Sequence, residues 1–346
     1  MIQNYRKSDA LRKTYIYTAM KNKPVYTLSG LVVSLVAVPL LFLFHLQTTA
    51  AITAAAGYFI ACKDFSKFTS PLQFITQVFA GLMTGVALEY PFEHFPFLLL
   101  TMFFVTLNTF GRIMFFKFFA YTGKTWFELS TLAIAIGTHI AGNMVGHSDM
   151  LSWLLPVPAL IFGCIITWGI VKDKKQLLNT TMKGYRVAIG STAPPFSLPD
   201  QNGKAVSLAD FHGDRHLLLI FVRGDWCPGC HMMLRTYQRE AERFKTKNIF
   251  VLSIGPDPVG VNQEMVERLG LDFRVLSDEG QKIAMTYGVQ IQDYDNAFAE
   301  KYEEGIPLPA SFLIDKNGIV RYVSRPYKVG EFLNPSLIFP IIEKLN

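Results

Sequence analysis

Six long apolar runs in the first half of the chain limit what it can fold into. They lie at residues 25–46, 48–62, 71–88, 95–110, 126–145 and 151–171. A helix needs about 20 apolar residues to cross a bilayer core. A single segment in lipid forms a helix because only a helix bonds all of its backbone N–H and C=O groups within the segment. We therefore expect residues 25–172 to form a polytopic helical membrane domain of about six spans. The second and fourth runs are the short ones.

Charge separates the two halves of the chain and predicts an orientation. Residues 1–189 carry 16 Lys and Arg against 7 Asp and Glu, whereas residues 190–346 carry 17 against 20. With six spans, all 16 basic residues of the first half lie on the side of the N-terminus. The excess of Lys and Arg in cytoplasmic loops then predicts an integral protein of the plasma or inner membrane with both ends in the cytoplasm. The slightly acidic second half does not favour nucleic acid as a partner.

We expect a basic cytoplasmic tail at residues 1–24 and a polar linker at 173–189 on either side of the membrane domain. Inside that domain, Glu128, His139 and Asn143 interrupt the fifth apolar run. Such residues mark functional sites or bond across helices, and packing is the favoured interpretation. Two isolated cysteines also lie in the apolar runs, at positions 62 and 164. They relay electrons to the second half under one hypothesis and are packing residues under the other.

Residues 190–346 alternate between strand and helix patterns. The branched apolar run at 217–222 predicts a buried strand, and residues 231–247 follow it with a helical period. Further strands are expected at 249–254, 273–276, 310–314 and 319–323, and further helices at 259–269, 278–287 and 335–345. The pattern predicts an α/β domain.

Two cysteines stand between the first of these strands and its helix. Cys227 and Cys230 enclose Pro and Gly, and Trp226 precedes them. A helix N-terminus stabilises a thiolate, so Cys227 is predicted to attack and Cys230 to close a disulfide with it. A structural zinc site needs four ligands, and His231 is the nearby additional one. The pair therefore favours redox chemistry, with no bound cofactor or metal expected.

This motif resembles the active site of the thioredoxin superfamily. The whole run 190–346 resembles its peroxiredoxin branch, the alkyl hydroperoxide reductase/thiol-specific antioxidant family. Residues 193–198 are similar to that family's entry strand, and residues 308–318 to the segment that carries a cis-proline. The resemblance implies a thioredoxin fold and antioxidant thiol chemistry. It also implies a cis Pro309 that faces the cysteine pair and, with Trp226, positions a substrate.

The chain departs from the peroxiredoxin pattern near the cysteines. That pattern has Pro seven residues and Thr or Ser three residues before its peroxidatic cysteine, and counting from Cys227 finds Ile220 and Gly224 there. Arg223 is the candidate substitute for the family's peroxide-binding arginine. Asp225 is the candidate for the proton-carrying acid of thioredoxins. These departures favour reduction of disulfides over reduction of peroxides.

The first half is similar to the membrane module of fusaric-acid-resistance and aromatic-acid-exporter proteins over residues 28–170. The similarity rests on small residues at 50–56 and 79–85. We predict a membrane-anchored thiol–disulfide oxidoreductase that acts on protein or small-molecule disulfides and thiols. The alternatives are a peroxiredoxin-like thiol peroxidase and a redox-sensing membrane transporter.

Overall fold

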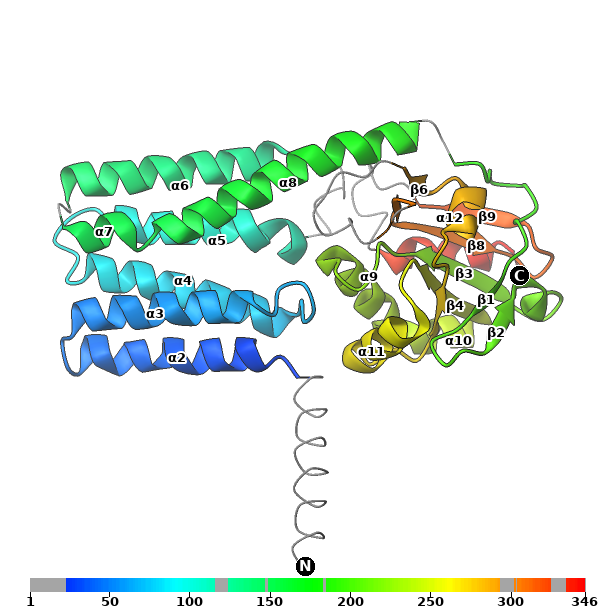
Figure 1. The fold of residues 1–346 in the computed structure, drawn as a ribbon, viewed down its shortest axis with the longest axis horizontal. Coiled ribbons are helices and arrows are strands. Elements are labelled where there is room, and N and C mark those ends of the chain that lie inside the picture. Colours follow the sequence, from blue (N-terminus) through cyan, green and yellow to red (C-terminus); the bar gives the residue numbers. More distant parts are fainter. Residues whose placement is uncertain are drawn as a thin grey trace, which may run out of the picture.

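The computed structural model describes residues 23–115, 124–146, 149–182, 185–292, 302, 304–324 and 334–345. The chain forms a helical bundle and an α/β part that lies against one end of it (Figure 1). The basic tail expected at residues 1–24 lies outside the described residues up to position 22.

Helices form at all six apolar runs. They are α2 (Val25–Phe42), α3 (Gln47–Cys62), α4 (Pro71–Glu89), α5 (Phe97–Met114), α6 (Trp126–Val145), and the pair α7 (Met150–Leu154) and α8 (Val157–Met182). Among the described residues, four helical stretches are long and apolar enough to cross a bilayer: α2, α4, α5 and Met150–Asn179. The helices are thus confirmed, and the number of spans stays a prediction.

Polar side chains inside the bundle pair with one another. The Arg112 guanidinium on α5 forms an ion pair with the fully buried Glu128 carboxylate on α6. Asn143 donates to the backbone carbonyl of His139 at 2.8 Å, one turn earlier on α6. Each of these bonds satisfies a group that would be costly in an apolar surrounding. The Arg112–Glu128 pair joins two helices, whereas the Asn143 bond lies within α6, so the packing interpretation of His139 and Asn143 stays a prediction.

Helix α8 continues beyond the apolar run and enters the α/β part. It runs to Met182, so the first ten residues of the expected linker are helical. Leu177 on this helix is 1% exposed and belongs to the core on one face of the α/β sheet. Burial of this leucine explains why the helix does not end at the polar residues after position 171.

The α/β part is built on a five-stranded sheet of order β5-β4-β3-β8-β9. The strands are β3 (His216–Phe221), β4 (Ile249–Gly255), β5 (Arg274–Ser277), β8 (Ala310–Ile314) and β9 (Val320–Val323). β3, β4 and β5 are parallel, and β8 runs antiparallel to β3 and β9. Short strands pair outside this sheet as β1 (Ser197–Pro199) with β2 (Ala205–Ser207) and β6 (Gln290–Ile291) with β7 (Ile306–Pro307).

Strand β3 is buried over its whole length because both faces of the sheet are covered. Leu217, Leu219 and Phe221 point into one core, and Leu218 and Ile220 into the other, as the two-residue period of a strand requires. The second core is shared with α9 (Pro228–Arg239), α10 (Ala241–Thr246), α11 (Val259–Leu269) and α13 (Phe339–Glu343). The single helix expected at 231–247 is therefore two helices that meet at Glu240.

Candidate functional site

The two cysteines lie at the start of α9, directly after the central strand. Cys227 is the N-cap residue of α9, and its Sγ accepts the backbone N–H of Cys230 at 3.2 Å. The two residues form a disulfide with their Cα atoms 5.3 Å apart. Both are enclosed, with exposed fractions of 2% for Cys227 and 0% for Cys230. We call Cys227 and Cys230 the redox pair, and residues 222–227 the redox loop.

Arg223 and Trp226 occupy the redox loop together and stack on each other. The Arg223 guanidinium lies 4.9 Å from the Trp226 ring centre, and Trp226 Nε1 donates to the Arg223 carbonyl at 3.1 Å. Both terminal nitrogens of Arg223 bind the Asp173 carboxylate on α8, at 2.9 and 3.0 Å. Arg223 was the candidate peroxide-binding arginine, but in the structure its guanidinium forms an ion pair with a carboxylate of α8.

Asp225 lies in a buried charged cluster. Its Oδ1 accepts from His231 Nε2 at 3.2 Å and forms an ion pair with the Arg268 guanidinium of α11. Burial lowers the pKa of His231, although the contact with Asp225 acts in the opposite direction, so the imidazole is neutral near pH 7. The Asp225 carboxylate thus holds two neighbouring helices to the redox loop.

Asp257 and Tyr302 support the redox loop through hydrogen bonds. The Asp257 carboxylate accepts the backbone N–H of Asp225 at 2.6 Å and the Tyr302 hydroxyl at 2.6 Å. Burial, with the nearby Asp257 charge, raises the pKa of Tyr302, so this hydroxyl stays protonated and donates. Gly224 has a φ of 123°, and a Cβ added there would collide with the Tyr302 hydroxyl.

Sequence reasoning missed both of these residues. Asp257 follows strand β4, which is parallel to β3, and the carboxyl ends of parallel strands meet at one edge of a sheet. That signal could have placed it beside the redox loop. Tyr302 lies in a charged segment that has no helix or strand pattern, so no comparable signal in the sequence places it beside the redox loop.

Pro309 lies where the resemblance placed it along the chain, but the expected cis bond is wrong. Among the described residues, the cis peptide bond is Tyr90–Pro91, and Leu308–Pro309 is trans. The first residue of β8, Ala310, pairs with Phe221 at the end of β3. Pro309 is therefore at the sheet edge that carries the redox loop.

The remaining cysteines lie apart in the bundle helices. Cys62 is the last residue of α3 and its Sγ accepts from Gln77 Nε2 at 3.4 Å, while Cys164 is exposed on α8. The electron relay through them stays a hypothesis. Within the described ranges, no group of three or more His, Cys, Asp and Glu side chains could hold a metal ion.

Comparison with known proteins assigns the α/β part to a family. The AhpC/TSA family model matches residues 189–323. Peroxiredoxin Bcp of Escherichia coli (strain K12) is 33% identical over 141 residues, which cover 41% of this chain and 87% of the relative. The chain belongs to the AhpC/TSA family of peroxiredoxins.

Plant relatives of this peroxiredoxin are longer than the matched segment. Chloroplastic peroxiredoxin Q of Oryza sativa subsp. japonica is 33% identical over 138 residues, which cover 40% of this chain and 59% of the relative. The solved structure of peroxidoxin BcpB from Mycobacterium tuberculosis has a TM-score of 0.41 and 22% identity, and covers 46% of this chain and 99% of that chain. The resemblance inferred for residues 190–346 is confirmed, and that of the helical half to exporter modules stays a prediction.

Proposed function

We propose that this peroxiredoxin is a membrane-anchored thiol peroxidase that uses Cys227 and Cys230 as its redox pair. The observation that carries the proposal is the bond from the Cys230 N–H to Cys227 Sγ at the start of α9. A backbone donor and the helix N-terminus both favour the thiolate over the thiol at Cys227. An attacking and a resolving sulfur within one helical turn are the two protein groups that a catalytic cycle needs when an oxidant and a reductant are supplied.

The cycle requires one oxidant and one reductant. The Cys227 thiolate attacks the outer oxygen of a hydroperoxide, the O–O bond breaks, and the alcohol or water leaves with a proton. The Cys230 thiolate then displaces hydroxide from the sulfenic acid on Cys227, which forms the disulfide and releases water. An external dithiol returns two electrons and two protons to the pair by thiol–disulfide exchange.

A thiol–disulfide oxidoreductase is the second candidate, and two observations favour it. Gly224 carries no hydroxyl where the family has Thr or Ser, and the Arg223 guanidinium binds Asp173. The same two cysteines would then exchange with a substrate disulfide. In this candidate Trp226 and Pro309 flank the bound substrate, as the sequence predicts.

Parallel assays of the full-length protein separate the two functions. The first assay follows consumption of hydrogen peroxide with a dithiol donor, and the second follows reduction of insulin disulfides with the same donor. We expect faster turnover with peroxide. Negligible peroxide consumption together with rapid insulin reduction would reject the peroxidase and favour the oxidoreductase.

We further propose that the helical half spans the membrane six times and keeps the redox pair in the cytoplasm. Exposed apolar side chains on the bundle helices support this proposal, among them Val32, Leu35, Ile75, Ile161 and Ile165. Two lysine side chains lie over aromatic rings at the end of the bundle that meets the α/β part. Lys63 Nζ is 5.2 Å from the Tyr26 ring centre, and Lys172 Nζ is 4.9 Å from the Trp168 ring centre. Such pairs suit a membrane–water boundary.

Reporter fusions after the last residue are expected to detect this orientation. A reporter active only in the cytoplasm should give signal, because the positively charged loops determine orientation. A reporter active only outside the cytoplasm should stay silent. The opposite result would place the redox pair outside and would imply an odd number of spans or an inverted bundle.

A further inference from the structure

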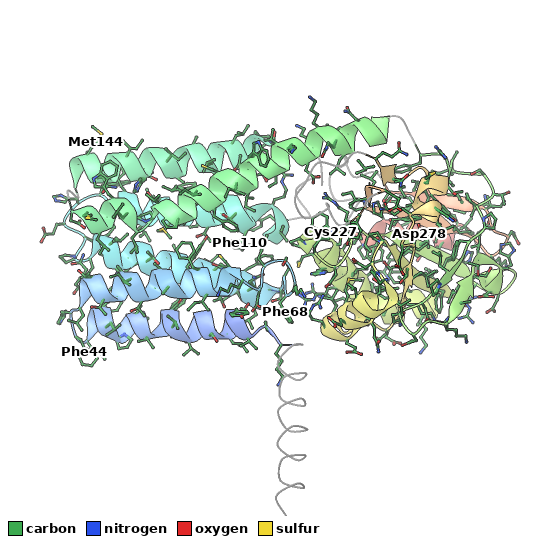
Figure 2. The ribbon with its side chains drawn as sticks, viewed as in Figure 1. Phe44, Phe68, Phe110, Met144, Cys227 and Asp278 are labelled. Carbon is green, nitrogen blue, oxygen red and sulfur yellow. A yellow bond between two sulfur atoms is a disulfide. The ribbon has the colours of Figure 1, made fainter. Side chains whose placement is uncertain are left out.

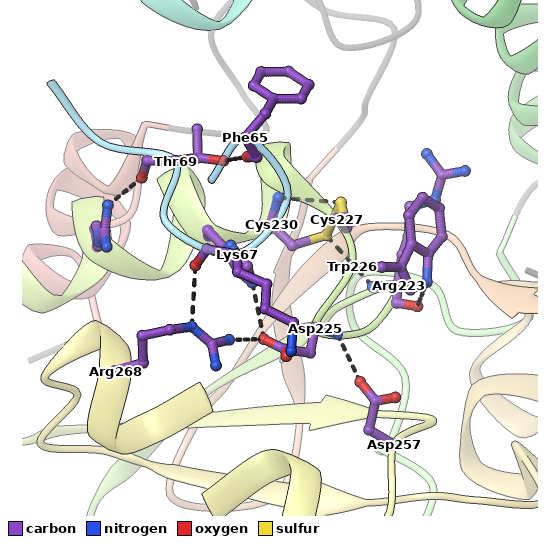
Figure 3. Close-up of polar contacts among 12 residues, drawn as sticks. Phe65, Lys67, Thr69, Arg223, Asp225, Trp226, Cys227, Cys230, Asp257 and Arg268 are labelled. Atoms are coloured by element: carbon purple, nitrogen blue, oxygen red, sulfur yellow. Dashed lines mark hydrogen bonds and ion pairs between the residues drawn. A yellow bond between two sulfur atoms is a disulfide. The ribbon is translucent and has the colours of Figure 1, made fainter. Parts of the chain in front are cut away.

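The connection between α3 and α4 lies against the two helices that border the redox pair. We call residues 63–70 the cap segment. Its Thr69 carbonyl accepts from the Arg235 guanidinium of α9, and its Lys67 carbonyl accepts from Arg268 Nε of α11 at 3.0 Å. Phe68 is 8% exposed, and its ring centre lies 5.6 Å from the Arg268 guanidinium. Figure 3 shows Lys67 and Thr69 of the cap segment beside the redox pair, with Arg268 reaching Lys67.

Arg268 joins the cap segment to the redox loop through a single side chain. While its Nε binds Lys67, its terminal nitrogen forms an ion pair with Asp225, two residues before Cys227. The Arg268 and Asp225 side chains are 3% and 9% exposed, so little water competes for their ion pair. The position of the cap segment and the position of the redox loop are therefore linked.

The bundle holds the cap segment at both ends. Asp64 accepts the backbone N–H and the hydroxyl of Thr27 at the start of α2, at 2.6 and 2.9 Å. Ser70 caps α4 by accepting the backbone N–H of Gln73 at 3.3 Å. Beside it, Met232 of α9 packs into the apolar cluster of the bundle. In Figure 2, Phe68 and Cys227 lie where the two halves meet, far from Phe44 and Met144 at the other end of the bundle.

The burial of Cys227 limits which substrates can reach its sulfur. With Cys227 2% exposed, a partner must enter between the redox loop and its surroundings. A folded protein must bring its disulfide in line with the Cys227 sulfur, and its own backbone needs room on both sides of that disulfide. A hydroperoxide presents two oxygens at the end of a narrow group and needs a much smaller opening.

We propose that the cap segment makes the redox pair selective for hydroperoxides over protein disulfides, and that Arg235 is the positioning residue that holds it closed. The inference rests on the proposed function, because it names which substrates of the redox pair are admitted. Arg235 suits this role because its guanidinium bonds the cap segment, whereas Arg268 also binds the redox loop.

The test uses the full-length protein, reduced beforehand and freed of reductant, in single-turnover reactions with insulin or hydrogen peroxide. With insulin, the Cys227 thiolate attacks one sulfur of the substrate disulfide, and Cys230 then displaces the substrate from the mixed disulfide. The substrate leaves as a dithiol and the redox pair ends as a disulfide. Both reactions consume the same two thiols, so their ratio reports access.

Arg235→Met removes the donor to Thr69, and we expect it to raise the insulin rate about tenfold, because a charged hydrogen bond is strong enough to shift a closed–open equilibrium by that factor. The peroxide rate should change by less than about twofold, since small oxidants already enter. Arg239→Met is the matched control: Arg239 is exposed on the same helix, and its loss should change neither rate. Arg235→Lys keeps a cationic donor and should restore selectivity.

An unchanged insulin rate in Arg235→Met, or an equal rise in Arg239→Met, would overturn the proposal.

Alkylation of reduced wild type provides a second measurement that needs no variant. Iodoacetamide should modify Cys227 much faster than a polyethylene-glycol maleimide, relative to their rates with free cysteine in solution. Equal relative rates for the two reagents would contradict the proposal that the cap segment restricts access to Cys227. Failure of wild type to reduce peroxide would reject the proposed function while leaving the insulin comparison to test the cap segment.

Discussion

Replacing Cys227 with serine is expected to lower kcat/KM for hydrogen peroxide on the order of a thousandfold or more, because a hydroxyl at its ordinary pKa is a far weaker nucleophile than a thiolate. Cys230→Ser should behave differently. It keeps the attacking sulfur, so the first equivalent of peroxide is still consumed, and the cycle stops at the sulfenic acid or at a mixed disulfide with the donor.

Stopped-flow oxidation followed by mass spectrometry distinguishes these outcomes. Cys164→Ser is the control, since Cys164 is exposed on α8 in the bundle, and it should turn over like wild type. The assignment of roles fails if Cys227→Ser keeps the first turnover and Cys230→Ser loses it. Cys230 would then be the nucleophile, and Cys227 would stand three residues before it, at the position of the family's Thr or Ser.

Gly224→Thr is expected to destabilise the protein rather than improve peroxide reduction. The change restores a family residue in sequence, but φ at this position is 123° and a Cβ would collide with the Tyr302 hydroxyl. Backbone strain and overpacking each cost about 1–3 kcal/mol. The displaced tyrosine would also lose its bond to Asp257, which holds the backbone of Asp225.

Thermal unfolding midpoints and peroxide kinetics of the full-length protein test this expectation. Gly213→Thr is a matched control, because Gly213 also has a positive φ of 80° but no heavy atom lies within 4 Å of its added Cβ. Gly213→Thr measures the cost of backbone strain alone, so Gly224→Thr should lower the unfolding midpoint more than Gly213→Thr does. A gain in peroxide turnover at unchanged stability would mean that the Tyr302 hydroxyl does not fill this place.

Local patterns predict much of this molecule. The helices follow from apolar runs, and the unit from β3 to α9 follows from a branched run, a cysteine motif and a helical period. Residues 190–346 are also assignable to the peroxiredoxins from the order of their motifs. These features depend on neighbours in the sequence, which is why they can be predicted without a structure.

Contacts between distant segments could not be predicted in this way. The pairing of Arg223 with Asp173 and of Arg235 with Thr69 joins residues from different halves of the chain. Nothing in the local sequence distinguishes these arginines from solvated ones. The trans bond at Pro309 likewise differs from what the local motif implies.

The passage of α8 into the α/β core determines where the chain can be cut. A soluble fragment that begins at residue 190 would match the family boundary but would lack Leu177 and Val187, both buried in that core. Each lost side chain would remove about 1.5–3 kcal/mol of burial, and Arg223 would lose its carboxylate partner on α8. A fragment that begins before Asp173 keeps all three. The folded unit that holds the redox pair is therefore larger than residues 189–323, the segment that matches the family.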